Sequence, residues 1–199
     1  MSQLLENLRR RRSIYQIGKN VSAAPDEIVA LIEDVVEQIP SSFNGQTSRV
    51  VVLFGQEHHT LWQIVKDTLR PLLSDEQFEQ TSQKVDGLFA AGFGTVLFFE
   101  DQDAIQSQQE QFALYAEHFP QFSEQHAGMV QLAVWTALAE AGIGATLQHY
   151  NPLINEAVAK QWQLPAGWLL RAQMPFGSIE APAGEKTHIA REERFKVFK

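Results

Sequence analysis

Apolar and polar residues alternate along the chain in blocks that predict helices and strands joined by short connections. The pattern predicts helices over residues 2–12, 25–39, 58–70, 74–91 and 123–141. Runs of β-branched and other apolar residues predict strands at 49–54, 95–99 and 168–174, with a shorter one near 145–149. Strands separated by long helical stretches favour an α+β or α/β fold.

Local signals refine several of these boundaries. Pro25 is expected to begin one helix, Pro40 to stop it, and Ser74 to cap another. Asn151 followed by Pro152 predicts a further helix start, with Asn as the cap and Pro at the first helical position. A Gln-rich segment that runs through Phe112 and other aromatic residues is also expected to be helical.

Length and composition indicate an ordinary globular chain. It has 199 residues, 44% of them hydrophobic and 20% charged, with no repeat, low-complexity tract or Gly/Ser linker. We therefore expect a single domain over residues 1–199. Residues 183–199 form a polar tail that ends with apolar residues, including Phe195 and Phe198. The tail either docks on a partner subunit or is an ordinary flexible extension.

Charge and cysteine content exclude several classes of protein. The formal net charge of −8 and a pI near 5.2 argue against nucleic-acid binding. Without cysteine the chain has no disulfide, thiolate nucleophile, iron–sulfur ligand or cysteine zinc site. No stretch approaches the roughly 18 apolar residues of a membrane span, and no apolar region of a secretory signal follows the N-terminal arginines. We expect a cytoplasmic protein that binds no membrane.

Four consecutive arginines, Arg9 to Arg12, precede Ser13 in this otherwise acidic chain. Guanidinium groups offer a rigid fork of donors that matches phosphate oxygens, so the run predicts an anion site. A solvated basic helix face is the alternative. In the tail, Lys186, His188 and Arg191 are cations that could close on the same phosphate, or could simply be solvated.

Two further segments carry groups suited to a flat heterocycle. The loop from Ser41 to Gln46 holds hydroxyl and carboxamide side chains that can bond ring carbonyls and nitrogens; alternatively it is a plain turn between helix and strand. Gly142 opens a turn and a short strand whose backbone N–H groups could face a ligand, or which simply connects two elements.

The order of these segments resembles the FMN-dependent nitroreductase family, in its small fatty-acid-repression-mutant-type branch. In that family an early Arg-x-Ser element and a late Lys-x-Arg element hold the FMN phosphate, and a Pro-Ser-Ser-x-Asn-x-Gln loop holds the ribityl chain and ring. The resemblance to the branch rests on the strand from Thr95 to Glu100, the run from Ser123 to Met129 and the run from Gln148 to Pro152. The FMN-binding positions that it implies are Arg11, Arg12, Ser13, Ser41, Ser42, Asn44, Gln46, Lys84, Gln148, His149, Tyr150, Lys186 and His188.

The chain departs from the family pattern at three positions. Tyr15 stands where members often have Arg or Lys, and Arg10 is the candidate to replace it. His188 stands where the second cation of Lys-x-Arg is expected. Lys84 is the lysine nearest to the place of the family's Lys near flavin N1, although its spacing to the following strand is longer than usual.

The resemblance implies a central mixed β-sheet flanked by helices, in an α+β homodimer with FMN at the subunit interface and the tail 183–199 exchanged between subunits. It also implies a ping-pong reaction in which NAD(P)H delivers hydride to flavin N5, and nitroaromatics, quinones or similar electrophiles take it up. Such chemistry needs no catalytic side chain of its own. A backbone N–H near His149 or Tyr150 would tune N5.

Other chemistries find little support in the sequence. Neither a Gly-x-Ser-x-Gly elbow, nor a phosphate-binding Walker loop, nor Gly-x-Gly-x-x-Gly after a strand is present. His58 and His59 beside Glu57 fit no common metal-ligand spacing, so a surface turn is expected there and no metal. Phe112, Tyr115 and Phe119 are expected in the core, or as a lid over the ring of a flavin. The alternative function is a flavin-binding regulatory or stress-response protein with little turnover.

Overall fold

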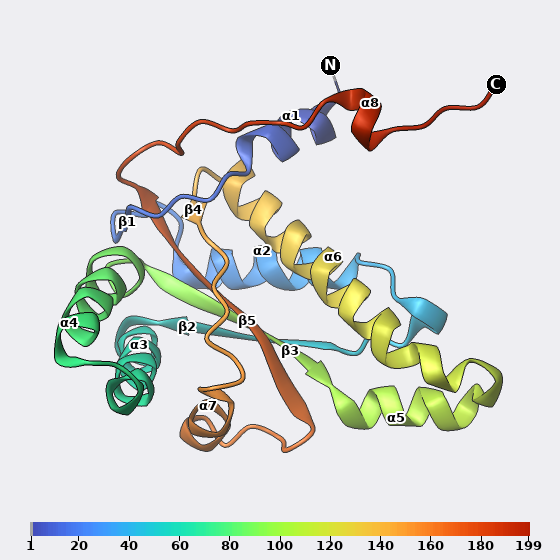
Figure 1. The fold of residues 1–199 in the computed structure, drawn as a ribbon, viewed down its shortest axis with the longest axis horizontal. Helices are drawn as coiled ribbons and strands as arrows, with labels where there is room; N and C mark the ends of the chain where they lie inside the picture. Colours follow the sequence, from blue (N-terminus) through green and yellow to red (C-terminus); the bar gives the residue numbers. More distant parts are fainter. Residues whose placement is uncertain (1) are drawn as a thin grey trace.

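The structure is a computed structural model that describes residues 2–199, and an antiparallel sheet crosses its centre (Figure 1). The strands are β1 (Ile17–Gly18), β2 (Ser48–Phe54), β3 (Gly94–Asp101), β4 (Gly144–Ala145) and β5 (Trp168–Ile179). Their order is β1-β5-β3-β2, with β4 also paired to β5. The named strands pair antiparallel. A parallel bridge joins Ser13 to Ala145.

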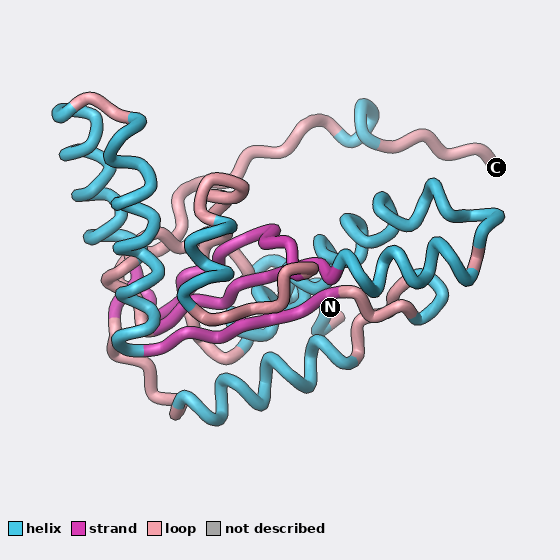
Figure 2. Tube along the Cα trace, turned by 90° about the horizontal axis from the view of Figure 1, so that it is seen from below, coloured by secondary structure: helices cyan, strands magenta, loops and turns pink. Residues whose placement is uncertain are grey.

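Eight α-helices surround this sheet in the described chain. They are α1 (Gln3–Arg10), α2 (Pro25–Glu37), α3 (Gly55–Leu69), α4 (Asp75–Lys84), α5 (Gln102–Gln111), α6 (Phe119–Glu140), α7 (Asn155–Gln161) and α8 (Arg191–Arg194). Short helical turns are η1 (Ser42–Asn44), η2 (Arg70–Leu72), η3 (Val85–Phe89) and η4 (Ala113–His118). Figure 2 shows the strands lying between helices on either side.

The side-chain alternation of the central strands builds a core on each face of the sheet. Val96 and Phe98 of β3 point to one face, where apolar residues of α2 and α6 cover them. Leu97 and Phe99 point to the other face, which α3, η3 and α7 cover. Because β3 is buried on both faces, its sequence is a continuous apolar run rather than an alternating one.

The predicted elements are largely confirmed, and the fold class is the α+β sheet with flanking helices that the sequence suggested. The helix beginning at Pro25 is α2, and the Ser74 side chain caps α4 by accepting from the Gln77 amide at 3.3 Å. The helix predicted over 74–91 divides into α4 and the π-helical turn η3.

The connection after α6 departs from prediction. The strand expected near 145–149 is two residues of β4 followed by an isolated bridge between Gln148 and Gln173. A helix does not begin at Asn151; α7 begins at Asn155. The Asn151 carboxamide oxygen accepts instead from Gln173 Nε2 at 3.2 Å, so this side chain is bonded to β5 rather than to a helix terminus.

The tail leaves β5 and passes along α1 before it ends away from the sheet (Figure 1). Four of its apolar side chains are well exposed in the single chain: Ile189, Phe195, Val197 and Phe198. None of the helices within residues 2–199 combines the length and the apolar character that a membrane crossing requires.

Candidate functional site

Residues from the two ends of the chain meet in one pocket. Arg11, Arg12 and Ser13, which follow α1, line a cavity of about 360 Å³ together with Lys186 of the tail. Tyr15 and Glu185 complete part of its wall. The pocket therefore brings together the three predicted N-terminal residues and Lys186, with an excess of positive charge, whereas the other two predicted tail cations, His188 and Arg191, line a neighbouring groove.

Helix α1 is anchored at the C-terminal end of α6. The carboxamide of Asn7 donates to Glu140 Oε2 at 2.6 Å, and Arg10 Nη1 donates to the Glu140 carbonyl at 3.3 Å. After the helix ends, the Ile14 amide donates to the carbonyl of Ala145 in β4 at 3.0 Å. These bonds hold the backbone of residues 11–13 between α6 and the sheet.

Arg11 is oriented by an aromatic ring. Its guanidinium carbon lies 4.4 Å from the ring centroid of Trp135, whose indole N–H donates to the Ala145 carbonyl at 3.1 Å. Burial, and then the charge of Arg12, lower the pKa of Arg11. A bound anion would oppose both effects, because a nearby negative charge favours the protonated guanidinium. Arg12 Nη2 donates to the Gly184 carbonyl at 2.6 Å and so joins the pocket to the tail.

The Ser41–Gln46 loop has a distinctive backbone. Phe43, Asn44 and Gln46 adopt left-handed conformations with φ of 52°, 53° and 47°. The Ser41 hydroxyl accepts from the Gln46 amide at 2.9 Å, and Gln108 of α5 donates to the Ser42 carbonyl at 3.1 Å. The loop is thus an ordered structure held from inside and from a neighbouring helix.

The turn from Gln148 to Tyr150 is fixed by β5. Gln148 exchanges two backbone bonds with Gln173, at 2.7 and 2.9 Å, and the Tyr150 amide donates to Gln173 Oε1 at 2.7 Å. The Tyr150 ring lies against Trp62, and burial raises the pKa of its hydroxyl. Since the Tyr150 amide is engaged within the chain, the exposed His149 is the better candidate to face a ligand.

Lys84 and His188 lie outside the pocket that Arg11, Arg12, Ser13 and Lys186 line. Lys84 is exposed at the end of α4, with its ammonium 5.7 Å from the ring centroid of Phe89, which also contacts Tyr150. His188 lines a larger groove between α1 and the tail, of about 1120 Å³, which Arg12 and Lys186 share. The groove places His188 beside the pocket rather than within it.

The cationic pocket, which Arg11, Arg12, Ser13 and Lys186 line, and the Ser41–Gln46 loop lie beside different parts of α6. Arg11 packs on Trp135, whereas Ser41 and Ser42 share a small hollow with Ser123 and neighbouring residues of the helix. Three helical turns, a rise of about 18 Å, separate Trp135 from Ser123. A single chain thus gathers the cationic pocket but holds the Ser41–Gln46 loop toward the other end of α6.

A buried polar network beneath the loop was not predicted as part of the site. The Glu100 carboxylate, in β3, accepts from three hydroxyl groups, one of which also contacts His126. In the sequence Glu100 ends a predicted strand that resembles the family branch, and no role in the site was assigned to its side chain. The signal available was a charged residue that directly follows a continuous apolar run.

The prediction of a surface turn at His58 and His59 is wrong. Both residues lie on α3, and His58 is buried with its ring bonded to Thr95 Oγ1 at 2.8 Å and to the Ala90 carbonyl at 3.2 Å. Burial lowers the pKa of His58 to about 4. Over residues 2–199 no group of three or more His, Cys, Asp or Glu residues is arranged to hold a metal.

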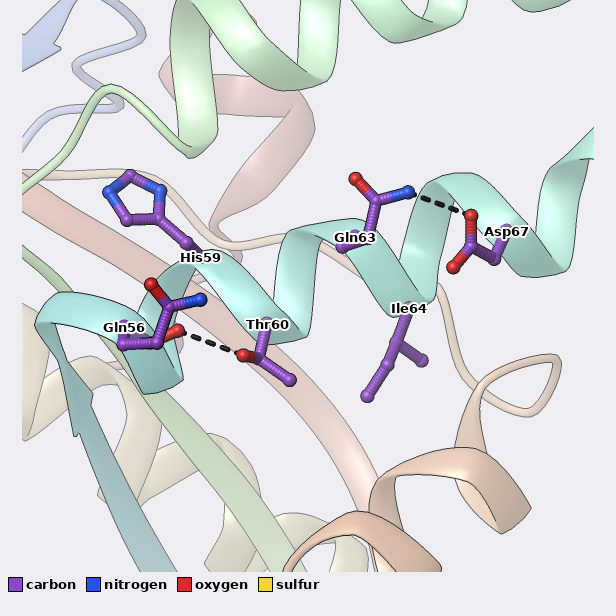
Figure 3. A pocket seen from close by; sticks show the side chains of 6 residues that line it. All are labelled: Gln56, His59, Thr60, Gln63, Ile64 and Asp67. Carbon is purple, nitrogen blue, oxygen red and sulfur yellow. Dashed lines mark hydrogen bonds between the residues drawn. The ribbon is translucent and has the colours of Figure 1, made fainter.

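A hollow of about 350 Å³ on the outside of α3 offers no second site. Its lining residues, which include His59, Gln63 and Asp67, all come from this one helix, and the Gln63 amide donates to Asp67 at 2.7 Å (Figure 3). None of the predicted cofactor-binding residues takes part in it.

The sheet with helices on both faces defines an α+β protein that carries a cationic pocket. The sequence pattern of the family described as "Nitroreductase family" matches residues 8–178. Because this match spans most of the chain, the protein belongs to the nitroreductase family.

Known proteins of this family resemble the whole chain. Nitroreductase CinD from Lactococcus lactis, solved in complex with chloramphenicol, is 49% identical with a TM-score of 0.91, over 99% of this chain and 100% of CinD. CinD has also been solved with 4-nitrophenol. The putative nitroreductase HBN1 of Saccharomyces cerevisiae is 30% identical, over 93% of this chain and 92% of HBN1.

A more distant structure shares the fold. The nitroreductase with bound FMN from Desulfitobacterium hafniense DCB-2 covers all of both chains at 16% identity, with a TM-score of 0.72.

Proposed function

We propose that the protein is an FMN-dependent oxidoreductase that passes electrons from NAD(P)H to nitroaromatics, quinones or similar electrophiles. The observation that carries the proposal is the meeting of Arg11, Arg12, Ser13 and Lys186 in one pocket. Family membership adds support, and a nitroreductase of the same fold contains FMN.

The pocket residues suit a phosphate monoester. Two guanidinium groups and an ammonium supply charge-assisted donors, and the Ser13 hydroxyl supplies a neutral one. Trp135 fixes the plane of the Arg11 guanidinium, so little side-chain entropy is lost when an anion binds. Lys84 and His188 remain candidates for outer contacts to the cofactor.

When bound, FMN supplies the hydride chemistry, accepting from NAD(P)H and giving to the electrophile in separate half-reactions. The chain's own residues bind and orient the two partners. Ser41, Ser42, Asn44 and Gln46 present hydroxyl and amide groups to the ring and the ribityl chain. No residue of the chain needs to act as a general acid or base in this proposal.

Aromatic side chains beside the loop suit a flat substrate. Phe43 lies 4.5 Å from Phe112 and 5.6 Å from Tyr115, measured between ring centroids. Phe43 and Tyr115 are both exposed. Exposed rings at this position can stack on a nitroaromatic or quinone. The complexes of CinD with chloramphenicol and 4-nitrophenol support this substrate class.

We further propose that the active protein is a homodimer in which each site uses both copies. The separation of the cationic pocket and the Ser41–Gln46 loop along α6 is the reason, because a second copy can supply the loop that the first holds elsewhere. Met129 and Leu132 on α6 are exposed apolar residues available to an interface. The apolar residues of the tail 183–199 would then be buried against the partner.

A single domain over residues 1–199 stays a prediction, and residue 1 lies outside the described range.

An absorption spectrum of freshly purified protein tests the proposal. Flavin bands that bleach with anaerobic NADH or NADPH, and return on adding 4-nitrophenol or a quinone, are the expected result. Bands that persist after NAD(P)H would favour the flavin-binding regulatory protein. A colourless protein that takes up no added FMN would overturn the cofactor assignment itself.

A further inference from the structure

A fully buried carboxylate lies behind the Ser41–Gln46 loop. Glu100, near the end of β3, accepts from Thr47 Oγ1 and from Ser123 Oγ, each at 2.5 Å to Oε2, and from Ser48 Oγ at Oε1. Three O–H donors satisfy an ionised carboxylate, whereas a protonated acid would compete with them to donate. A buried charge is costly, and here hydroxyl groups from β2 and α6, together with Thr47, compensate it.

This arrangement fixes the tautomer of a neighbouring histidine. Ser48 has one hydroxyl proton, and when it goes to Glu100 the 3.2 Å contact with His126 Nδ1 is a bond that the ring donates. In that arrangement His126 is protonated at Nδ1, and Nε2 is left as an acceptor in the neutral ring. Burial lowers the pKa of His126, while the charge of Glu100 opposes this effect.

The network lies directly against the loop. Thr47 is the next residue after Gln46, and Thr47, Ser123 and His126 line a hollow of about 10 Å³ together with Ser41 and Ser42. This hollow is too small for a flavin ring, so it is a support behind the loop rather than the ligand site.

The loop needs such support. Its left-handed residues Phe43, Asn44 and Gln46 are costly and persist only where the surroundings restrain them. Arg49 Nη1 donates to the Gln46 carbonyl at 2.6 Å, and Glu100 holds the next residue, Thr47. Besides the Ser41 hydroxyl, which accepts from the Gln46 amide, charged side chains of the sheet therefore restrain the end of the loop.

We propose that Glu100 is a positioning residue that fixes the end of the Ser41–Gln46 loop and, through Ser48, holds His126 as the Nδ1–H tautomer. Its importance for cofactor binding rests on the proposed function, because that proposal assigns the loop to FMN. Glu100 itself touches neither cofactor nor substrate.

Glu100→Gln is the sharpest variant. A carboxamide keeps the size of the side chain but has one acceptor oxygen, and its NH₂ group donates. It cannot accept from all three hydroxyl groups, so Ser48 is released to donate to His126 Nδ1. The ring should then change to the Nε2–H tautomer, which ¹⁵N NMR of the histidine ring at pH 7.5 distinguishes directly.

Hydrogen exchange in the FMN-free protein gives a second readout. We expect the amides of Asn44, Gly45 and Gln46 to exchange about tenfold faster in Glu100→Gln, and the FMN dissociation constant of the variant to rise. The matched control is Thr95→Val on the same strand, which removes a buried hydroxyl bonded to His58 and Trp62 instead. The control should leave exchange in the loop unchanged.

Each result decides the proposal. Wild-type protein with the Nε2–H tautomer, or loop exchange that Thr95→Val accelerates as much as Glu100→Gln does, would overturn it. If Glu100→Gln fails to fold, Thr47→Val removes one donor alone, and unchanged loop exchange in that variant would also overturn the proposal. Wild-type protein that binds no FMN would contradict the proposed function, yet the tautomer and exchange measurements would still decide the role of Glu100.

Discussion

At the scale of single residues, three of the four N-terminal arginines differ in their surroundings. Arg10 donates to the end of α6, Arg11 stacks on Trp135, and Arg12 reaches the tail. Arg10 thus anchors α1, whereas Arg11 and Arg12 line the pocket, although the three residues are identical and consecutive in the sequence. The sequence predicted an anion site from this run, but it could not assign Trp135, because that residue lies far along the chain.

Arg11→Ala should weaken FMN binding more than it slows hydride transfer. Loss of one charge-assisted contact corresponds to about a 10- to 100-fold rise in the FMN dissociation constant. Rates measured with saturating FMN should change by less than about threefold, because the proposed site places Arg11 at the phosphate end of FMN, away from the reacting ring. Fluorescence titration and stopped-flow reduction measure the two quantities. Lys160→Ala on α7 is the control, and an unchanged affinity in Arg11→Ala would remove Arg11 from the site.

His58 should make stability depend on pH. The folded pKa is about 4, against about 6.5 in the unfolded chain, so below pH 6.5 the unfolded state takes up a proton that the folded ring does not. The contribution of His58 to the free energy of unfolding is fully present above pH 6.5. It decreases as the pH falls toward 4, by a total of about 3 kcal/mol.

Urea unfolding at pH 7.5 and 4.5 tests this dependence at constant protein and FMN concentration. The unfolding free energy of the wild type exceeds that of His58→Gln by an amount that should be about 2 to 3 kcal/mol smaller at the lower pH. The control is His59→Gln on the same helix. Its unfolding free energy should still show the pH dependence that His58 causes. An equal advantage at both pH values would show that burial does not keep the His58 ring neutral.

At the scale of elements, the sequence predicted what hydrophobic periodicity controls. β3 and α6 lie close to their predicted bounds because long apolar patterns are dictated by the core that they face. The start at Asn151 was wrong because its capping side chain is taken by Gln173 from a strand 22 residues away. Likewise, Glu100 shows its role only once Thr47, Ser48 and Ser123 converge on it. Local patterns do not encode such long-range partners.

Gly177→Ala should disrupt the pairing of β1 with β5. A Cβ atom at Gly177 would lie 2.1 Å from the Gly18 carbonyl oxygen, which is backbone and cannot swing aside. We expect a loss of about 1 to 3 kcal/mol in unfolding free energy, in the range of overpacked sites. Gly184→Ala is the control, since a Cβ there meets nothing within 4 Å. Thermal unfolding compares the two; equal stability would mean that the edge strand yields without cost.

At the scale of the whole molecule, the tail and α6 carry apolar surface that a single chain leaves exposed. Phe198 is 94% exposed, and Leu132 of α6 is 45% exposed. Large apolar side chains without cover are typical of protein interfaces when they gather on particular elements. The dimer proposed above would account for both features, and it would bring the Ser41–Gln46 loop to the partner's cationic pocket.

Deleting residues 183–199 should abolish the dimer and FMN retention together. The deletion removes Lys186 as well as the apolar end, so the double variant Phe195→Asp and Phe198→Asp separates the two causes. That variant keeps Lys186 but should still dissociate, as measured by light scattering after size exclusion. A deleted chain that stays dimeric and yellow would contradict the exchanged-tail proposal.

Mixed dimers test whether each site is built from both copies. One copy would carry Arg12→Ala with Lys186→Ala in the pocket, and the other would carry Ser41→Ala with Asn44→Ala in the loop. Each variant alone should bind FMN poorly. If pocket and loop come from different copies, a mixed dimer contains one site with both parts intact, and differently tagged, co-purified dimers should bind about one FMN with wild-type affinity. If a single chain supplied the whole site, every site in the mixed dimer would carry a substitution, and mixing would restore nothing.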